Sequence, residues 1–260
     1  MSFYDEDFCN CEYVYNQNIN IDFDGFRNSK EFFFLDNRTP EPDIDALNIG
    51  REINNSLMEK YLKVKKSKLG YKNALKNQYS DCDQLDSRHY MMSCFIFSYL
   101  NSISFNPDNI LEIGGGFGNW CYINQDIVNY KKWTILDLPF VTNLQRWFIN
   151  KELKDVSRIN LISYSDNNDY KNLINQKNVF DLIIATHSLS ELKMEIFNEY
   201  LNKILTKTKY LFYAYSKKQH NGQGNPQDKI DLLNKHFLKV KEINSERGVV
   251  GNIIYKNKNL

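Results

Sequence analysis

The residues best suited to chemistry form a short glycine cluster with an acid in front of it. Residues 109–119 read Asn-Ile-Leu-Glu-Ile-Gly-Gly-Gly-Phe-Gly-Asn, so four glycines fall within five positions after an apolar run. Glycines at such a turn let the backbone bend sharply and let a ligand approach the main chain without a Cβ atom in the way. A helical pattern from Trp120 to Val128 follows, so the segment is typical of a nucleotide-binding strand-loop-helix unit.

The spacing of the glycines decides between classes of nucleotide site. No frame that starts at Gly114, Gly115 or Gly116 gives G-x-G-x-x-G, and no Gly-Lys-Ser/Thr follows. The dinucleotide fingerprint and the Walker-type phosphate loop are therefore excluded. The segment matches E-x-G-x-G-x-G instead, with Glu112 in the first position and Gly118 in the last.

A second acid lies where the next strand should end. Residues 133–137 read Trp-Thr-Ile-Leu-Asp, which is a short apolar run that closes on Asp137. A carboxylate at this place, about 20 residues after the glycines, can accept both hydroxyls of a ribose. The glycine cluster alone also fits a tight turn in some other α/β protein, and Asp137 is the residue that favours a nucleoside.

Another polar group follows the apolar run at 179–185. Residues 186–191 read Thr-His-Ser-Leu-Ser-Glu. An imidazole with a pKa near ~6.5 is largely neutral at pH 7 and can take a proton from a hydroxyl. We therefore predict His187 as a general base and Glu191 as the group that orients it. A capping box between Ser188 and Glu191 is the alternative for the acid, and a structural role is the alternative for His187.

Helices and strands must bring these groups to one place, and the pattern of apolar residues predicts where those helices and strands lie. The predicted strands cover 110–113, 133–137, 158–163, 179–185, 208–215, 237–244 and 249–256, and the helices between them cover 119–130, 140–153, 168–176, 190–205 and 226–236. Repeated strand–helix units predict a doubly wound parallel sheet, and the short link at 246–248 predicts an antiparallel last strand. Ligands of such sheets lie beyond the carboxyl ends of the strands, where the glycines, Asp137 and His187 all fall.

The first 85 residues follow a different pattern. Residues 1 to about 44 are predicted to be irregular or to form short strands. Apolar residues at helical spacing then predict helices at 43–68, 71–79 and 86–106, of which the last is largely buried. We therefore predict two units, which are an N-terminal, mainly helical cap or substrate lid at 1–85 and the nucleotide-binding domain at 86–260.

Composition excludes several classes of function. The chain has 260 residues and a formal net charge of +1, and its densest basic run, 63–68, lies on a predicted helix, so nucleic acid is disfavoured as a partner. No apolar stretch is long enough to span a bilayer, and the N-terminus lacks an apolar signal core. Five scattered cysteines predict reduced thiols in a cytoplasmic protein, and Cys9 and Cys11 have no partner pair for zinc.

The glycine pattern with Asp137 resembles the first motifs of the class I S-adenosylmethionine (SAM)-dependent methyltransferases, which have a Rossmann-like fold. Residues 137–139, Asp-Leu-Pro, resemble the small-molecule O-methyltransferases of plants and bacteria, in which a His stands just after the fourth strand. Together with Gln145 and the run 186–191, the set resembles a bacterial family of sugar O-methyltransferases. The resemblance covers roughly 86–220 and implies a seven-stranded methyltransferase sheet.

The resemblance implies SAM as cofactor and S-adenosylhomocysteine (SAH) as product. From the motifs and from position at the strand ends, the expected cofactor-binding residues are Glu112, Gly114, Gly115, Gly116, Gly118, Asp137, Leu138, Tyr164, Asp166 and Thr186. Asp166 also fits a helix N-cap in a polar loop. The catalytic pair would be His187 and Glu191, and a fourth strand that ends in Thr and His rather than Asp favours a metal-free base.

The acceptor side is expected to come from four further residues. Arg88 and Tyr90 open the helix before the first strand, Tyr215 ends the fifth strand, and His220 lies in the polar loop after it. Arg88 would suit a phosphate or carboxylate on the substrate, and His220 could bind sugar hydroxyls or belong to a solvated loop. The predicted partner is thus a saccharide or another small molecule.

Two other functions stay open beside sugar O-methylation. One is a methyltransferase for a different acceptor, such as a phenolic metabolite, a natural product or a protein side chain. Because no Asn/Asp-Pro-Pro-Tyr/Phe follows the fourth strand, the types that methylate amino groups of DNA or of protein glutamine are disfavoured. The other is a non-catalytic protein with a methyltransferase fold, which the intact glycine motif and Asp137 argue against.

Overall fold

The fold is built around one mixed sheet. The structure is a computed structural model, and it describes residues 23–28, 41–71, 82–164, 167–175, 180–217, 225–245 and 250–260. Its strands are β1 (Asn109–Ile113), β2 (Lys132–Asp137), β3 (Ile159–Ser163), β4 (Phe180–Thr186), β5 (Thr208–Ser216), β6 (Phe237–Ser245) and β7 (Val250–Asn257). The order is β3-β2-β1-β4-β5-β7-β6. The first five strands are parallel to one another, and β7 runs antiparallel to both β5 and β6, as predicted.

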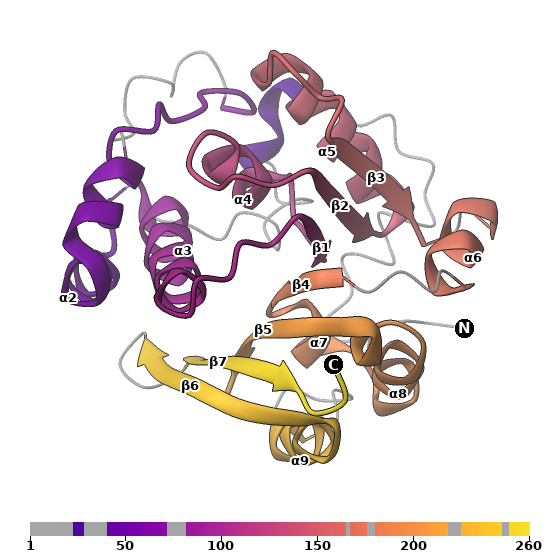
Figure 1. Cartoon of the computed structure of the whole chain (residues 1–260). Coiled ribbons are helices and arrows are strands. Elements are labelled where there is room, and N and C mark those ends of the chain that lie inside the picture. Colours follow the sequence, from indigo (N-terminus) through magenta and orange to yellow (C-terminus); the bar gives the residue numbers. More distant parts are fainter. Residues whose placement is uncertain are drawn as a thin grey trace.

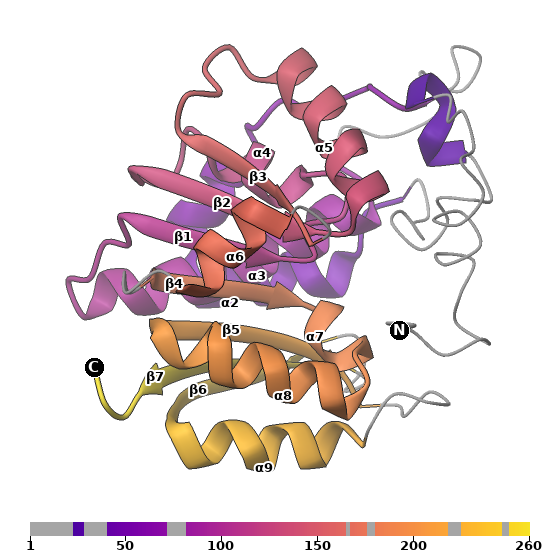
Figure 2. The same cartoon turned by 90° about the vertical axis from the view of Figure 1, so that its right-hand side faces the viewer.

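Helices cover both faces of this sheet (Figure 1). They are α2 (Ile44–Tyr61), α3 (Gln84–Ser102), α4 (Asn119–Asn124), α5 (Pro139–Glu152), α6 (Asn167–Asn175), α7 (Ser188–Glu191), α8 (Met194–Lys203) and α9 (Pro226–His236), with short 3-10 helices η2 (Phe23–Asn28) and η5 (Leu205–Lys207). One face carries α3, α4 and α5, with α2 packed against α3, and the other carries α6, α8 and α9 (Figures 1 and 2).

The strands are apolar because both of their faces are buried. In β1, Ile110 belongs to the core under α3 and α4, whereas Leu111 and Ile113 belong to the core under α8 and α9. The one acid inside the fourth-strand run has a local role. The carboxylate of Asp181 accepts the backbone N–H groups of residues 108 and 109 at 2.9 Å each, and so it fixes the start of the neighbouring strand β1.

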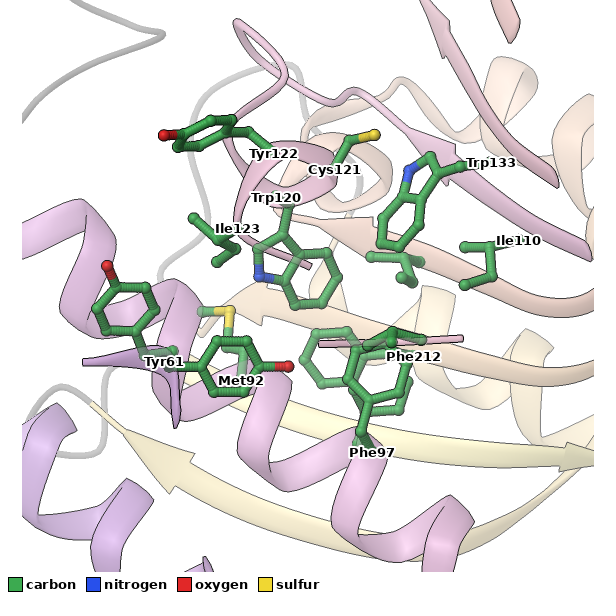
Figure 3. Packing of buried hydrophobic residues seen from close by; sticks show 14 of the residues in the cluster. Tyr61, Met92, Phe97, Ile110, Trp120, Cys121, Tyr122, Ile123, Trp133 and Phe212 are labelled. Atoms are coloured by element: carbon green, nitrogen blue, oxygen red, sulfur yellow. The ribbon is translucent and has the colours of Figure 1, made fainter. Parts of the chain in front are cut away.

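The N-terminal helices share a core with the sheet (Figure 3). Tyr61 at the end of α2 donates a hydrogen bond of 2.6 Å from its hydroxyl to Oδ1 of Asn124 in α4. Trp120 of α4 lies with its ring centroid 5.6 Å from that of Phe212 in β5. The predicted N-terminal helical region is therefore present, and the proposed division at residues 85 and 86 falls in the first turn of α3.

Several predicted helices end elsewhere in the structure. The helix predicted at 86–106 ends at Ser102, and residues 72–79 of the helix predicted at 71–79 lie outside the described residues. The helix predicted at 43–68 begins as expected, with Asp43 as its N-cap, but ends at Tyr61. The helix predicted at 119–130 ends at Asn124, whose side-chain amide donates to the carbonyl of Trp120 at 2.8 Å. The backbone N–H of Ile127 then bonds to the carbonyl of Asn124, an i→i+3 turn that closes the helix.

The helix predicted at 190–205 is broken into α7 and α8 for a reason that lies far along the chain. Leu192 has extended backbone angles, with φ −70° and ψ 146°. The ammonium group of Lys229, in α9, donates to the carbonyls of Leu189, Ser190 and Leu192 at 3.2, 2.7 and 2.5 Å. The break in the helix therefore does not leave these three carbonyls without a partner.

Candidate functional site

The glycine turn has the backbone conformation that its composition predicts. Gly114, Gly116 and Gly118 have φ values of 72°, 55° and 96°, which are left-handed angles that favour glycine. The N–H of Gly114 donates to the carbonyl of Leu136 in β2, and the N–H of Gly118 donates to the carbonyl of Gly115, both at 2.9 Å. The turn is thus tied to the neighbouring strand and leads directly into α4.

Glycine is required at these positions for different reasons. A Cβ on Gly114 would lie 2.3 Å from Cβ of Ser188, and a Cβ on Gly115 would lie 2.6 Å from Cγ2 of Ile135. At Gly116, by contrast, a Cβ would meet nothing within 4 Å. Two of the glycines are therefore needed for packing, whereas Gly116 faces open space into which a ligand can come close to the main chain.

Asp137 lies beside this turn at the end of β2. Its Oδ1 accepts the N–H of Leu138 and its Oδ2 accepts Nε2 of Gln145, both at 2.8 Å. Burial raises the pKa of Asp137 from 3.8 to about 7, although the hydrogen bonds from Leu138, Gln145, Gly115 and Gly116 act in the opposite direction. The carboxyl group therefore changes its charge near neutral pH.

Gln145 joins the acid to the turn, a role that sequence reasoning did not assign. Its Nε2 donates both to Asp137 and to the carbonyl of Gly116 at 2.8 Å. Its Oε1 is buried and has no hydrogen-bond partner among the described residues. A buried acceptor without a donor is uncommon in folded proteins, and this one lies next to the open side of the turn.

Glu112 does not face the open side of the turn. Its side chain is 1 % exposed, and its Oε2 accepts Nε1 of Trp133 at 2.8 Å. Alternation along β1 explains this direction, because Leu111 and Ile113 point to the opposite face. The structure therefore places Glu112 beneath the turn, where a Cβ on Gly115 would lie 3.1 Å from the carboxyl carbon of Glu112. The role of Glu112 in cofactor binding stays a prediction.

Replacing Glu112 by glutamine is expected to raise the free energy of unfolding at pH 8 but not near pH 4. Burial raises the pKa of Glu112 from 4.5 to about 8. Between these values the native protein keeps a proton that the unfolded chain loses, so the stability of the parent falls as the pH rises. Glutamine cannot ionise and still offers an oxygen to Trp133. Urea unfolding at several pH values tests this, and a pH-independent difference between variant and parent would contradict it.

His187 follows β4 directly, and α7 begins just beyond it at the same end of the sheet as the glycine turn (Figure 2). Its backbone is strained, with φ 62° and ψ −34°. Its N–H donates to the carbonyl of Ala214 at 2.8 Å, and its own carbonyl accepts the hydroxyl of Ser190 at 2.6 Å. Strain of this kind costs about 1–3 kcal/mol and occurs most often at functional sites.

The imidazole of His187 is neutral at pH 7. Burial, and next the positive charge of Arg88, lower its pKa to about 4. Arg88, near the start of α3, bonds through Nε to Oδ2 of Asp43 at 3.1 Å. The structure therefore brings together two residues that are 99 positions apart in the sequence and that were predicted to serve base and acceptor roles.

The residues after His187 are held in ways that the sequence did not reveal. Ser188 donates its hydroxyl to the carbonyl of Ile113 at the end of β1, so it is not the N-cap of α7 and the alternative capping box with Glu191 does not form. The backbone N–H of Glu191 donates to the carbonyl of His187 at 3.2 Å, but among the described residues no hydrogen bond joins the carboxyl group of Glu191 to the imidazole of His187. Burial raises the pKa of Glu191 to about 7, and Lys229 acts in the opposite direction. The orienting role of Glu191 stays a prediction.

The other predicted residues divide into three groups. Leu138, Tyr164 and Thr186 are partly buried at the carboxyl ends of their strands or just beyond them. Tyr90 and Tyr215 are only 1 % and 6 % exposed and stack on Tyr61 and Tyr213, so both rings are packed in the core. Their role in acceptor binding stays a prediction. Asp166 and His220 lie outside the described residues.

Among the described residues, no group of three or more His, Cys, Asp or Glu side chains has the arrangement of a metal site. No helix among them has both the length and the apolar content needed to cross a bilayer.

Comparison with known proteins gives the fold a name. No protein-family model matches the chain, and no curated protein matches it. Among solved structures, magnesium protoporphyrin IX methyltransferase (ChlM) from Synechocystis PCC 6803 with bound SAM is 11 % identical with a TM-score of 0.52, and the match covers 82 % of this chain and 98 % of that one. The PH0226 protein of Pyrococcus horikoshii OT3 is 12 % identical with a TM-score of 0.50, over 73 % and 100 %. The chain therefore has the Rossmann-like fold of the class I methyltransferases.

Proposed function

We propose that this protein is a SAM-dependent O-methyltransferase that transfers a methyl group to a hydroxyl of a sugar or glycan precursor. The observation that carries the proposal is the open side of Gly116 next to the carboxyl group of Asp137. Solved neighbours of the fold include ChlM with bound SAM and with bound SAH. The sugar as acceptor is supported by the motif resemblance at 112–119, 137–139 and 186–191.

The residues present fit the nucleoside part of this cofactor. Gly116 offers bare main chain, and Asp137 offers carboxylate oxygens suited to ribose hydroxyls. Gln145 offers a buried acceptor to which no described residue donates. Leu138 follows Asp137 and would contact the base, with Tyr164 beside it and Thr186 across the sheet. When bound, SAM supplies an activated methyl group on a sulfonium, so the protein has only to position the acceptor and remove a proton.

His187 is the residue that would remove the acceptor's proton. Its imidazole is neutral at pH 7, and its backbone is fixed by hydrogen bonds on both sides. The charge of Arg88 acts on the imidazole, and we propose both side chains for the acceptor side. We propose the segment 1–85 as the cap or substrate lid. The described cysteines, Cys82, Cys94 and Cys121, are free thiols, in keeping with the cytoplasmic location that we propose.

Titration calorimetry with SAH tests the cofactor, and the acceptor needs a second experiment. The proposal expects a 1:1 complex with SAH and SAM but not with NAD or ATP. A screen of nucleotide-sugars and free saccharides with labelled SAM then identifies the acceptor, with phenolic compounds as the competing class. No heat with either SAM or SAH would overturn the proposal, and labelling of phenols alone would overturn its sugar part.

Replacing Gly116 by alanine is expected to weaken SAH binding at least ten-fold while the protein stays folded. The new Cβ enters space that the ligand-free protein leaves open, so the cost inside the protein is mainly the left-handed φ of 55°. Gly114→Ala is the matched control, because its Cβ would collide with Ser188 and destabilise the fold itself. Calorimetry and thermal unfolding of both variants separate the effects. Unchanged SAH affinity in folded Gly116→Ala would contradict the proposed location of the cofactor.

A further inference from the structure

Lys229 in α9 is a fully buried cation. Its ammonium group donates to the carbonyls of Leu189, Ser190 and Leu192 at 3.2, 2.7 and 2.5 Å, and the residue is 0 % exposed. Its Nζ also lies 5.6 Å from the ring centroid of Phe197 in α8. An ammonium group has three N–H donors, so all three are used here. Burial lowers the pKa of Lys229 from 10.5 to about 8, and the group is therefore still mainly charged at pH 7.

The carbonyls that Lys229 binds lie at the end of the short helix that begins just after the proposed base (Figure 2). Helix α7 has only four residues, Ser188–Glu191, and a single helical turn is not stable by itself. The carbonyl of His187 accepts the N–H of Ser190 at 2.9 Å and its hydroxyl at 2.6 Å, and it also accepts the N–H of Glu191 at 3.2 Å. Ser190 therefore links the two residues directly, because its carbonyl bonds to Lys229 and its donors bond to His187.

The backbone of His187 needs support from both sides. Its φ of 62° and ψ of −34° are strained, and such a conformation persists only where the surrounding structure fixes it. On one side, the N–H of His187 bonds to the carbonyl of Ala214 at 2.8 Å, and the hydroxyl of Ser188 bonds to the carbonyl of Ile113. On the other side the support is α7, whose far end is held by Lys229.

A purely structural role is the alternative for this lysine. The carboxyl end of a helix attracts cations, because its last carbonyls carry partial negative charge. A buried ammonium is nevertheless costly to desolvate, and an apolar side chain of similar volume often stabilises a core as well. The two roles predict different results. A structural role lowers only the stability when the ammonium is lost, whereas a positioning role also moves the imidazole of His187 in protein that is still folded.

We propose that Lys229 is a positioning residue for the proposed base: its ammonium group holds α7 and thereby directs the imidazole of His187 towards the acceptor. The inference rests on the proposed function, because it takes His187 as the group that removes the proton. Lys229 acts through Ser190 and the backbone, so its role requires no contact with the cofactor or the acceptor. A displacement of about 1 Å at a catalytic group can cost ~10²-fold in rate.

Chemical rescue of Lys229→Ala tests this inference. The probe is n-propylamine, which replaces the atoms that the substitution removes. With the acceptor identified by the labelled-SAM screen, turnover is expected to fall at least ten-fold in Lys229→Ala and in Lys229→Met, while the affinity for SAH stays at the parental value. Propylammonium should restore turnover of Lys229→Ala saturably but not that of Lys229→Met, whose side chain fills the space. Lys235→Met, which is exposed in the same helix, is the control for loss of a charge and should behave as the parent.

NMR of histidine-labelled protein supplies a readout that a structural role would not change. The chain has four histidines, and the signal of His187 is the one that His187→Ala lacks. In the SAH complex of Lys229→Ala this signal should shift or broaden, and propylammonium should return it to the parental position. Ser190→Ala removes one link between the two residues but keeps the carbonyl that Lys229 binds, so it should shift the same signal and lower turnover as well.

The outcomes separate this inference from the proposed function. Parental turnover or an unchanged His187 signal in folded Lys229→Ala would overturn the inference, and so would a loss of turnover that merely follows the unfolded fraction. If neither Lys229 variant folds, Ser190→Ala decides, and parental turnover with an unchanged signal in that variant overturns the inference. Failure of the parent protein to bind SAH would instead overturn the proposed function.

Discussion

Replacing His187 by alanine is expected to lower turnover by ~10²–10⁴ while the affinity for SAH stays at the parental value, because general-base catalysis contributes rate enhancements of this size. His187 follows β4 directly, whereas the main residues proposed to hold the nucleoside are Gly116 in the turn after β1, Asp137 at the end of β2 and Gln145 in α5. Steady-state rates with the identified acceptor, together with SAH calorimetry, measure both quantities. Parental turnover in the variant would remove His187 from the mechanism.

A glycine at the same position provides the matched control. His187→Gly removes the imidazole equally, but glycine adopts the φ of 62° without strain. We therefore expect His187→Gly to be about 1–3 kcal/mol more stable than His187→Ala, with the same loss of turnover. Urea unfolding compares the two. Equal stability would mean that the backbone relaxes in the alanine variant and that the strain belongs to the histidine side chain.

Replacing Asp137 by alanine is expected to weaken SAH binding by ~10² or more, since each hydrogen bond to a charged group contributes about 1.5–3 kcal/mol and a ribose offers two hydroxyls. Asp137→Asn keeps the shape and one acceptor oxygen, so it should bind with intermediate affinity. Because Asp137 also accepts from Leu138 and Gln145, thermal unfolding of each variant is the control for folding. Parental affinity in a folded Asp137→Ala would contradict the proposed ribose contact.

The charge of Asp137 adds a pH dependence to that result. Burial raises its pKa from 3.8 to about 7, so in the ligand-free protein the native state binds the extra proton and stability falls as the pH rises between those values. Binding of the cationic cofactor favours the ionised form. SAM affinity should therefore increase from pH 6 to pH 8 with release of a proton, which calorimetry in two buffers detects, and the dependence should be absent in Asp137→Asn.

Most of the sheet follows from the sequence because local patterns determine it. Apolar runs buried on both faces identify the strands, and Asn225 and Pro226 mark the start of α9, whose bounds agree with the prediction. The left-handed glycines were predictable for the same reason, since the turn needs angles that other residues avoid. Helix ends were predicted less well where a distant side chain decides them. Lys229 breaks the helix after Glu191 from another element of the chain.

The sequence by itself determined the strand-loop-helix unit, the acid at Asp137 and the place of His187 at the end of β4. Only the tertiary structure decided that Glu112 points beneath the turn, that Tyr90 and Tyr215 are packed in the core, and that the charge of Arg88 acts on His187. The physical reason is that residue type and spacing define backbone conformation over a few positions, whereas the direction and electrostatic surroundings of a side chain depend on elements that fold against it from far along the chain.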